Sequence, residues 1–328
     1  MGKRRSKRYY VRHVAIVLVV ILLVAAALLL LKFWETKQGR YDAPGTESEK
    51  VIYQEKEYVL KDGIETFLVL GLDTYEGSED ENNGKQADFL MLFVMDNNTK
   101  QTSAIQINRD TMANVNRLDI GGNKIDTSVK QIALAYNFIY DDSEKLSCRN
   151  TADSVSDLLL DTKVDHYISF TMDSVAIMND LVGGVEVNVL DDFTGIDDAL
   201  VKGETVTLKG EQALRYVRTR YGLEDSSNST RMKRQRQYID ALYDKTISCI
   251  NNDESFIVEM VDSMSEYVVY DSSNYRLKEF VEKFDEYEFL GIREIEGESK
   301  VGEKFMEFYP SEDSVNEIVF DLFYTVKE

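Results

Sequence analysis

The sequence predicts an α/β (α+β) fold, in which helices flank a central mixed β-sheet, preceded by one N-terminal transmembrane helix. Two observations predict this class. Short apolar runs bounded by turn residues, as in buried strands, are mixed with segments whose apolar residues recur at helical spacing. An uncharged apolar run, Val14–Leu31, lies near the N-terminus. No internal repeat and no Pro/Gly/Ser-rich linker divides the chain after residue 60, so we expect a single domain there.

The apolar run predicts a membrane anchor. At about 1.5 Å per residue it crosses most of a ~30 Å hydrocarbon core, and Phe33 and Trp34 extend it into an interfacial edge. Basic residues without any acid precede it, so the positive-inside rule keeps the N-terminus in the cytoplasm. A cleaved signal peptide is the alternative, but the run exceeds the usual ~7–15 residues and no small-x-small cleavage site follows. We expect a single-pass protein of the cell membrane.

The anchor sets the predicted order of the chain. The segment between anchor and domain is polar and poor in periodicity, which suits a short stalk. We therefore expect a cytoplasmic basic tail, a transmembrane anchor, an extracytoplasmic stalk and an extracytoplasmic domain, at residues 1–13, 14–34, 35–61 and 62–328.

Charge is divided unevenly along the chain. The formal net charge is -21, yet residues 1–40 hold nine Lys/Arg and one acid, which leaves 29 Lys/Arg against 58 acids for the rest. Such an acidic body repels polyanions, so no nucleic-acid partner is expected and any basic cluster within it needs a specific explanation. Cys148 and Cys249 could pair outside the cytoplasm or remain buried thiols.

The expected elements follow from the two periodicities. Strands are predicted at Thr66–Leu70, Phe89–Met95, Ser103–Ile107, Tyr167–Thr171 and Val185–Val189. Helices are predicted at Val129–Tyr140, Arg149–Leu160, Ser174–Leu181, Thr230–Tyr243 and Ser314–Phe323. The segment YVRTR is expected to be extended, which would point Arg218 and Arg220 to the same side.

Several common chemistries are disfavoured. His13 lies in the predicted cytoplasmic tail, so His166 alone would have to serve any exported His-based zinc site or Ser-His-Asp triad. A packed structural histidine is the simpler interpretation. No Walker-type or dinucleotide-binding loop is present.

Acids and arginines at strand ends carry the remaining signal. Asp73 follows the first strand and Asp88 opens the second, so the two carboxylates could share a magnesium ion or could be ordinary turn acids. Arg109 and Asp110 follow the third strand, where they could form a local ion pair.

A basic cluster lies further along the acidic body, with seven cations within 22 residues. On the predicted helix, Arg231, Arg234 and Gln235 share one face, and Gln235 also lines up with the apolar stripe. Planar guanidinium groups bind phosphate oxygens bidentately, so a converging set would form a phosphate or pyrophosphate clamp. A solvated charged helix face is the alternative. The members are Arg215, Arg218, Arg220, Arg231, Lys233, Arg234 and Arg236.

Four segments in order resemble the LytR-CpsA-Psr (LCP) family of bacterial cell-envelope proteins, from about Thr66 to Tyr324. They are FLVLGLDT, QADFLMLFVMDNNTKQTSAIQINRDT, VDHYISFTMDSVAIMNDLVGGVEVNV, and LKGEQALRYVRTR followed by RMKRQRQ. The resemblance implies an LCP-type domain on a type II membrane protein. It also implies a Mg²⁺-dependent (or Mn²⁺-dependent) phosphotransferase that moves a glycopolymer with its phosphate from a polyprenyl-pyrophosphate carrier to peptidoglycan or a related wall acceptor.

The resemblance also assigns roles to residues. Asp73 and Asp88 would hold the metal, and Asp88, Arg109 and Asp110 would take part in catalysis. The pyrophosphate would be bound by Arg109, Arg218, Arg220, Arg231, Arg234 and Gln235. An apolar tunnel would take the prenyl chain, although core packing explains the same candidates: Ala133, Tyr136, Phe170, Val175, Met178 and Leu181.

Three positions depart from the family pattern. Gln86 stands in place of an arginine, Asn108 in place of a proline, and Asn228 in place of an acid. Weakened turnover, an altered substrate and loss of catalysis are all open. The alternative functions are a non-catalytic protein that binds polyprenyl phosphate or wall polymer in envelope regulation or assembly, and a polyprenyl-pyrophosphate hydrolase. A transcriptional role conflicts with the predicted topology.

Overall fold

The computed structural model describes residues 50–72, 85–137, 143–253, 255–271, 286–303 and 305–327. The chain separates into two compact units, Met1–Lys50 and Val51–Glu328, and the description below concerns the second. The predicted cytoplasmic tail and transmembrane anchor lie outside the described residues. Within the described part of the chain, none of the helices has both the length and the apolar character needed to cross a bilayer.

A six-stranded mixed sheet forms the centre of the unit, in the order β11-β8-β3-β4-β5-β12. The pairs β3–β4, β4–β5 and β8–β11 are antiparallel, whereas β3–β8 and β5–β12 are parallel. The predicted central mixed sheet is therefore confirmed. Its strands are β3 (Ile64–Leu72), β4 (Ala87–Asp96), β5 (Gln101–Ile107), β8 (His166–Thr171), β11 (Val268–Tyr270) and β12 (Glu288–Glu294).

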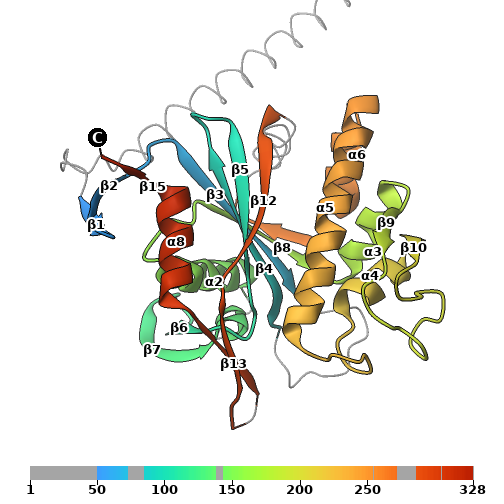
Figure 1. Cartoon of the computed structure of the whole chain (residues 1–328), viewed down its shortest axis with the longest axis horizontal. Coiled ribbons are helices and arrows are strands. Elements are labelled where there is room, and N and C mark those ends of the chain that lie inside the picture. The colour runs from blue at the N-terminus through green and yellow to red at the C-terminus, as the bar shows by residue number, and fades with distance from the viewer. Residues whose placement is uncertain are drawn as a thin grey trace, which may run out of the picture. The chain divides into compact units, whose positions relative to one another are not determined.

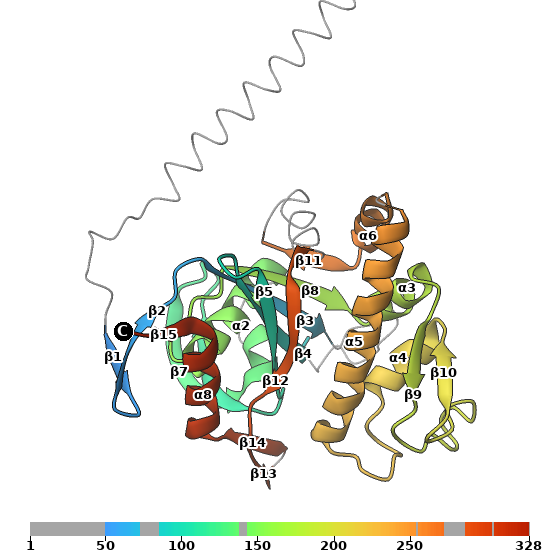
Figure 2. The same ribbon diagram turned by 45° about the horizontal axis from the view of Figure 1, so that its top comes forward.

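Helices cover both faces of this sheet (Figures 1 and 2). Alternation of side chains along β3 and β4 places Leu68, Leu70, Leu90 and Leu92 on one face, where they pack in one apolar core with α2 and α8. The opposite face carries α5, and beside α5 lies a second apolar core built from α3, α4, α6, β9 and β10. The bounds of these elements are α2 (Glu144–Leu158), α3 (Asp173–Leu181), α4 (Glu211–Arg218), α5 (Asn228–Asn252), α6 (Phe256–Met264), α8 (Glu312–Phe323), β9 (Val185–Asn188) and β10 (Thr205–Leu208).

Two predicted elements were wrong. The segment that contains YVR is the helix α4 rather than an extended strand, because Ala213, Leu214 and Val217 recur at helical spacing and are buried in the second core. The helix expected at Val129–Tyr140 is described up to residue 137, and this part is the end of β7 followed by a short 3-10 helix, η1 (Ile132–Tyr136). Its β-branched and polar N-terminal part pairs with β6 in a hairpin, β6 (Met112–Leu118) with β7 (Lys124–Gln131).

Part of the predicted stalk is folded. Residues 51–60 form β1 (Val51–Tyr53) and β2 (Lys56–Leu60), and β2 also pairs with the C-terminal strand β15 (Tyr324–Val326). Tyr53 stacks on Phe320 of α8, with ring centroids 4.2 Å apart. The compact unit therefore begins at Val51 and not near residue 62.

A second hairpin was not predicted from sequence. It comprises β13 (Gly297–Val301) and β14 (Met306–Pro310), and it exposes most of its side chains. Both cysteines are free thiols: Cys148 is buried in the first core, and Cys249 packs against the second.

Candidate functional site

The ends of three neighbouring strands bring the predicted site residues together. In the sheet register Leu72 of β3 lies opposite Ala87 of β4, and Ile107 of β5 lies opposite Leu90 of β4. Because β4 runs antiparallel to both neighbours, the first residues of β4 and the residues that follow β5 meet at the same edge. Asp88 and the segment 108–110 therefore lie side by side.

Asp88 is the centre of the site. Its side chain is buried, and it accepts a hydrogen bond from Arg109 through Oδ1 and one from Arg231 through Oδ2, the latter at 3.0 Å. Burial lowers the pKa of Arg231, and the adjacent Asp88 carboxylate opposes this shift. One carboxylate thus holds two guanidinium groups, which leaves a local excess of positive charge.

Asp110 forms the second acidic group of the site. Its Oδ1 accepts a hydrogen bond from Gln131 at 2.9 Å and lies 3.5 Å from Nε of Arg109, while Oδ2 is 4.0 Å from Nη1 of Arg220. Burial raises the pKa of Asp110 above its usual value, and the neighbouring arginines offset that rise only in part. A carboxylate of raised pKa is a better proton acceptor than an exposed aspartate.

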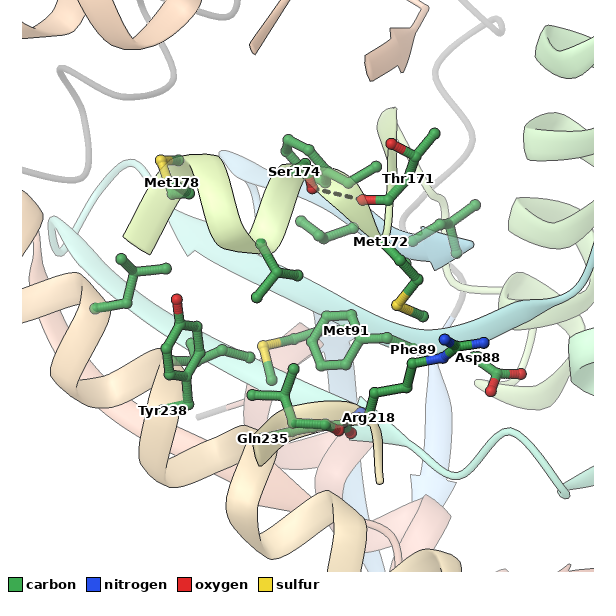
Figure 3. Close-up of a pocket in the computed structure, with 18 of the residues that line it drawn as sticks. Asp88, Phe89, Met91, Thr171, Met172, Ser174, Met178, Arg218, Gln235 and Tyr238 are labelled. Atoms are coloured by element: carbon green, nitrogen blue, oxygen red, sulfur yellow. Dashed lines mark hydrogen bonds between the residues drawn. The ribbon is translucent and has the colours of Figure 1, made fainter. Parts of the chain in front are cut away.

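The end of α4 supplies two further arginines. Arg218 is the last residue of the helix, and Figure 3 shows its side chain reaching towards Asp88. Arg220 follows the helix and lies over the ring of Tyr221, 4.7 Å from its centroid. The predicted convergence of Arg218 and Arg220 on the site is found, although the expected reason, an extended strand, was wrong.

Arg234, which was predicted to bind the pyrophosphate, has other partners. Arg234 is 1% exposed and is paired with Asp191 and with the backbone carbonyl of Thr219, away from Asp88. It packs over the ring of Phe193, 5.4 Å from the centroid. Arg234 therefore holds the segment between Arg218 and Arg220 and does not line the site, a correction to the sequence-based assignment.

Gln235 belongs to a chain of buried amides. It donates to the carbonyl of Val217 at 3.3 Å and accepts from Gln106 at 3.3 Å, and Gln106 in turn accepts from Arg236 at 2.6 Å. The prediction that a buried glutamine would need a partner is thus confirmed. Its side chain also lines the cavity described next.

An apolar cavity of about 210 Å³ opens beside Asp88, between the sheet, α3 and α5. In Figure 3 Asp88 and Arg218 lie at one end, whereas Met178 and Tyr238 lie at the other. Its volume is many times the ~10–15 Å³ that a single water needs, and its walls are almost entirely apolar. Such a shape suits an apolar chain that carries a charged group at one end.

Three of the six predicted lipid-binding residues line this cavity: Phe170, Val175 and Met178. The other three do not. Ala133 and Tyr136 are buried in η1 on the other side of the sheet, and Leu181 packs against the second core. For these three, ordinary core packing is the correct interpretation.

The residues of the site suit a hard cation in part. Asp73 lies outside the described residues, and among those that the structure describes no group of three or more His, Cys, Asp or Glu is arranged to hold a metal. Each Asp88 oxygen accepts one arginine hydrogen bond, which leaves a second lone pair on each. Magnesium commonly takes one or two carboxylates and completes its shell with phosphate oxygens and water, so Asp88 fits that role.

All three departures from the family pattern contact this cluster. Gln86 accepts a hydrogen bond from Arg109, and Asn228 accepts one from Arg231 at 2.6 Å and donates to Asn108 at 2.7 Å. Sequence reasoning missed Gln131, the partner of Asp110. Its place at the end of β7, in a segment predicted to be helical, gave no signal of that contact.

Comparison with known proteins agrees with this architecture. The protein-family model described as the LytR_cpsA_psr family matches residues 32–321. A relative named polyisoprenyl-teichoic acid–peptidoglycan teichoic acid transferase TagU, from Bacillus licheniformis, is 31% identical over 178 residues, which cover 54% of this chain and 51% of TagU. The chain thus spans about half the length of that relative.

Solved structures share the fold. The crystal structure of B. subtilis TagV has a TM-score of 0.58 at 22% identity and covers 80% of this chain and 97% of that one. A protein of Streptococcus agalactiae has a TM-score of 0.62 at 20% identity, covering 79% and 86%. With a family match that spans most of its length, this chain belongs to the LytR_cpsA_psr family.

Proposed function

We propose that this chain is a phosphotransferase that moves a glycopolymer with its phosphate from a polyprenyl-pyrophosphate carrier to peptidoglycan or a related wall acceptor. The observation that carries the proposal is the junction of the cavity with the arginines. An apolar cavity ends at Asp88, where Arg109, Arg218 and Arg231 gather. A prenyl chain joined to a pyrophosphate matches this arrangement, because it has a long apolar part with a charged group at one end.

Charge supports the binding of a pyrophosphate. Among the residues that the structure describes, the site holds four guanidinium groups, those of Arg109, Arg218, Arg220 and Arg231, and two carboxylates, those of Asp88 and Asp110. This formal excess of two positive charges lies in a chain whose net charge is -21. Planar guanidinium groups bind phosphate oxygens through paired N–H donors, so the arginines would orient the pyrophosphate and stabilise the charge that develops on it.

The transfer itself requires a displacement at phosphorus. An acceptor hydroxyl oxygen bonds to the glycan-bearing phosphorus, the bond from that phosphorus to the bridging oxygen breaks, and polyprenyl phosphate leaves. The hydroxyl proton passes to a carboxylate. Asp110 suits this step, because burial raises its pKa and Gln131 fixes the position of its carboxylate.

We also propose that the site binds a magnesium or manganese ion. Asp88 would hold it, with Asp73 as the second expected carboxylate. When bound, such an ion neutralises charge on the phosphate oxygens. Arg109 and Arg231 position Asp88 through hydrogen bonds to its two carboxylate oxygens.

The proposed location of the protein is compatible with this function. We propose that Val14–Leu31 anchors the chain in the cell membrane with the folded unit outside the cytoplasm, where a lipid-linked donor and the wall acceptor both occur. The relatives that match this chain include proteins whose names state a teichoic acid and peptidoglycan as substrates. Those names support a wall glycopolymer as the class of substrate.

The full-length protein in detergent micelles tests the proposal. With Mg²⁺, a polyprenyl-pyrophosphate-linked glycan and peptidoglycan oligomers, mass spectrometry should detect a glycan joined to the oligomer through a phosphodiester. Omitting the oligomer separates the alternatives, since a hydrolase would then release glycan phosphate and polyprenyl phosphate at an unchanged rate. A protein that binds the donor but forms neither product under any of these conditions would contradict the proposed transfer and favour the non-catalytic alternative.

A further inference from the structure

Two asparagines connect the segment after β5 to the start of α5. Asn108 and Asn228 are 6% and 7% exposed, and Nδ2 of Asn228 donates to Oδ1 of Asn108 at 2.7 Å. The same Oδ1 accepts the backbone N–H of Asp110 at 2.9 Å. Oδ1 of Asn228 accepts a hydrogen bond from Nη2 of Arg231 at 2.6 Å. We call Asn108 and Asn228 the amide relay.

The orientation of both amides follows from their partners. Arg231 offers only donors, so the Asn228 oxygen must face it and its nitrogen must face Asn108. The backbone N–H of Asp110 is also a donor, so the Asn108 oxygen must point back to Asn228. Each residue therefore supplies the group that the other needs, and neither is replaced without disturbing its partner.

The relay fixes one arm of Arg231 while Asp88 fixes the other. Nη1 donates to Asp88 at 3.0 Å and Nη2 to Asn228 at 2.6 Å. A carboxylate in place of Asn228 would also accept from Nη2, but it would add a negative charge beside the cation. The amide holds the guanidinium group without reducing the positive charge available to a phosphate.

We propose that Asn108 and Asn228 act as one positioning unit, which holds Arg231 for the pyrophosphate of the donor and preserves the positive charge of the site. The proposal rests on the proposed function, because it names pyrophosphate as the ligand of Arg231. Two of the three departures from the family pattern are then a single coupled change.

A double-mutant cycle on the full-length protein tests the coupling, with farnesyl pyrophosphate as the probe and its dissociation constant measured by calorimetry. Asn228→Ala removes the hydrogen bond to Arg231, and Asn108→Ala removes the hydrogen bond that orients Asn228 towards Arg231, so each should weaken binding about tenfold. The double variant should also be weakened about tenfold. A product of the two single effects, about a hundredfold, would overturn the proposal. Asn188→Ala, an exposed position on β9, is the matched control.

Asn228→Asp separates positioning from charge. The new carboxylate still accepts the hydrogen bond from Nη2 of Arg231, and an acid at the first residue of a helix is favourable. The affinity for farnesyl pyrophosphate should nevertheless fall about tenfold, since the charge excess is reduced and the new oxygen faces Oδ1 of Asn108. Wild-type affinity in this variant would overturn the proposed charge effect.

A wild-type protein that does not bind the probe would contradict the proposed function instead. In that case the unfolding midpoints of Asn108→Ala, Asn228→Ala and the double variant test whether the amide relay acts as one unit. Non-additive shifts would support the relay as a unit, and additive shifts would overturn it.

Discussion

Arg231 and Arg234 lie one turn apart on α5, and both are buried, at 5% and 1% exposed. Arg231 shares Asp88 with a second arginine at the mouth of an apolar cavity. Arg234 has Asp191 as its partner, together with a backbone carbonyl and an aromatic ring. Counted over the described residues, the first region carries more positive than negative charge, whereas the second pairs one arginine with one aspartate. Excess charge beside a cavity, and not burial, marks the region that suits a ligand.

The largest effect should come from the balanced region. Arg234→Gln would leave Asp191 and the Thr219 carbonyl without their buried partner, so the free energy of unfolding should fall by about 3–5 kcal/mol. Chemical denaturation of the full-length protein measures this. Lys233→Gln, the exposed neighbour, should change it by less than ~0.5 kcal/mol. A stable Arg234→Gln variant that loses only binding would invalidate the comparison.

The acid of the first region should control the rate. Asp110→Asn should lower transfer about a hundredfold, because an amide cannot take the acceptor proton. The wild-type rate should rise with pH through the pKa of Asp110, which burial raises, since the deprotonated form is the active one. A pH–rate profile of the variant should lack that rise. Asp126→Asn, on the β6–β7 hairpin, is the control and should keep both rate and profile.

Two arginines of α4 provide a matched pair. Arg218 lines the cavity next to Asp88, while Arg215, one turn earlier, pairs with Asp197 at 3.2 Å and is about half exposed. Arg218→Gln should weaken farnesyl pyrophosphate binding by roughly tenfold, through loss of a charged donor, with little change in unfolding. Arg215→Gln should leave the dissociation constant unchanged. Equal losses in the two variants would mean that overall charge, rather than position, drives binding.

The smallest effect is expected for His166, which lies between Glu65 and Asp271, away from the cavity. Hydrogen bonds to Asp271 and Glu65 raise the pKa of His166 to about 9, against an ordinary value of 6.5. The charged imidazole therefore stabilises the fold fully below pH 6.5, and this contribution is lost as the pH rises through about 9. His166→Gln should cost about 1 kcal/mol at neutral pH, since the group is partly solvated, and almost nothing above pH 10. Unfolding at several pH values tests this; an unchanged difference would refute it.

Sequence predicted the central strands well because burial on both faces produces continuous apolar runs such as that in β4. It failed for α4, where Tyr216 and Val217 suggested a strand and only packing against the second core selects a helix. It also failed for residues 51–60, where β1 and β2 are short and largely exposed strands that pair with each other, and where β2 also pairs with β15, more than 250 residues away. Local pattern cannot reveal such distant pairing.

The candidate site, like the fold, was predicted from sequence only in part. Asp88, Arg109 and Arg231 were identified because their residue types follow strand ends or share a helix face. The difference between Arg231 and Arg234 was not predictable, since both occupy the same helix and Asp191 is remote in sequence. Asn108 and Asn228 looked like losses of function, and their hydrogen bond, 120 positions apart, is visible only in three dimensions.

The pairing of β2 with β15 also constrains the order of folding. Glu57 accepts a hydrogen bond from the backbone of Lys327, and β12 joins the central sheet beside β5 from nearly 190 positions further along the chain. A nascent chain therefore lacks an edge strand of its central sheet until β12 has been made, and β2 lacks its partner until β15 has been made. During that interval β5 and β2 each expose an edge of unpaired backbone donors and acceptors, at which other strands can pair.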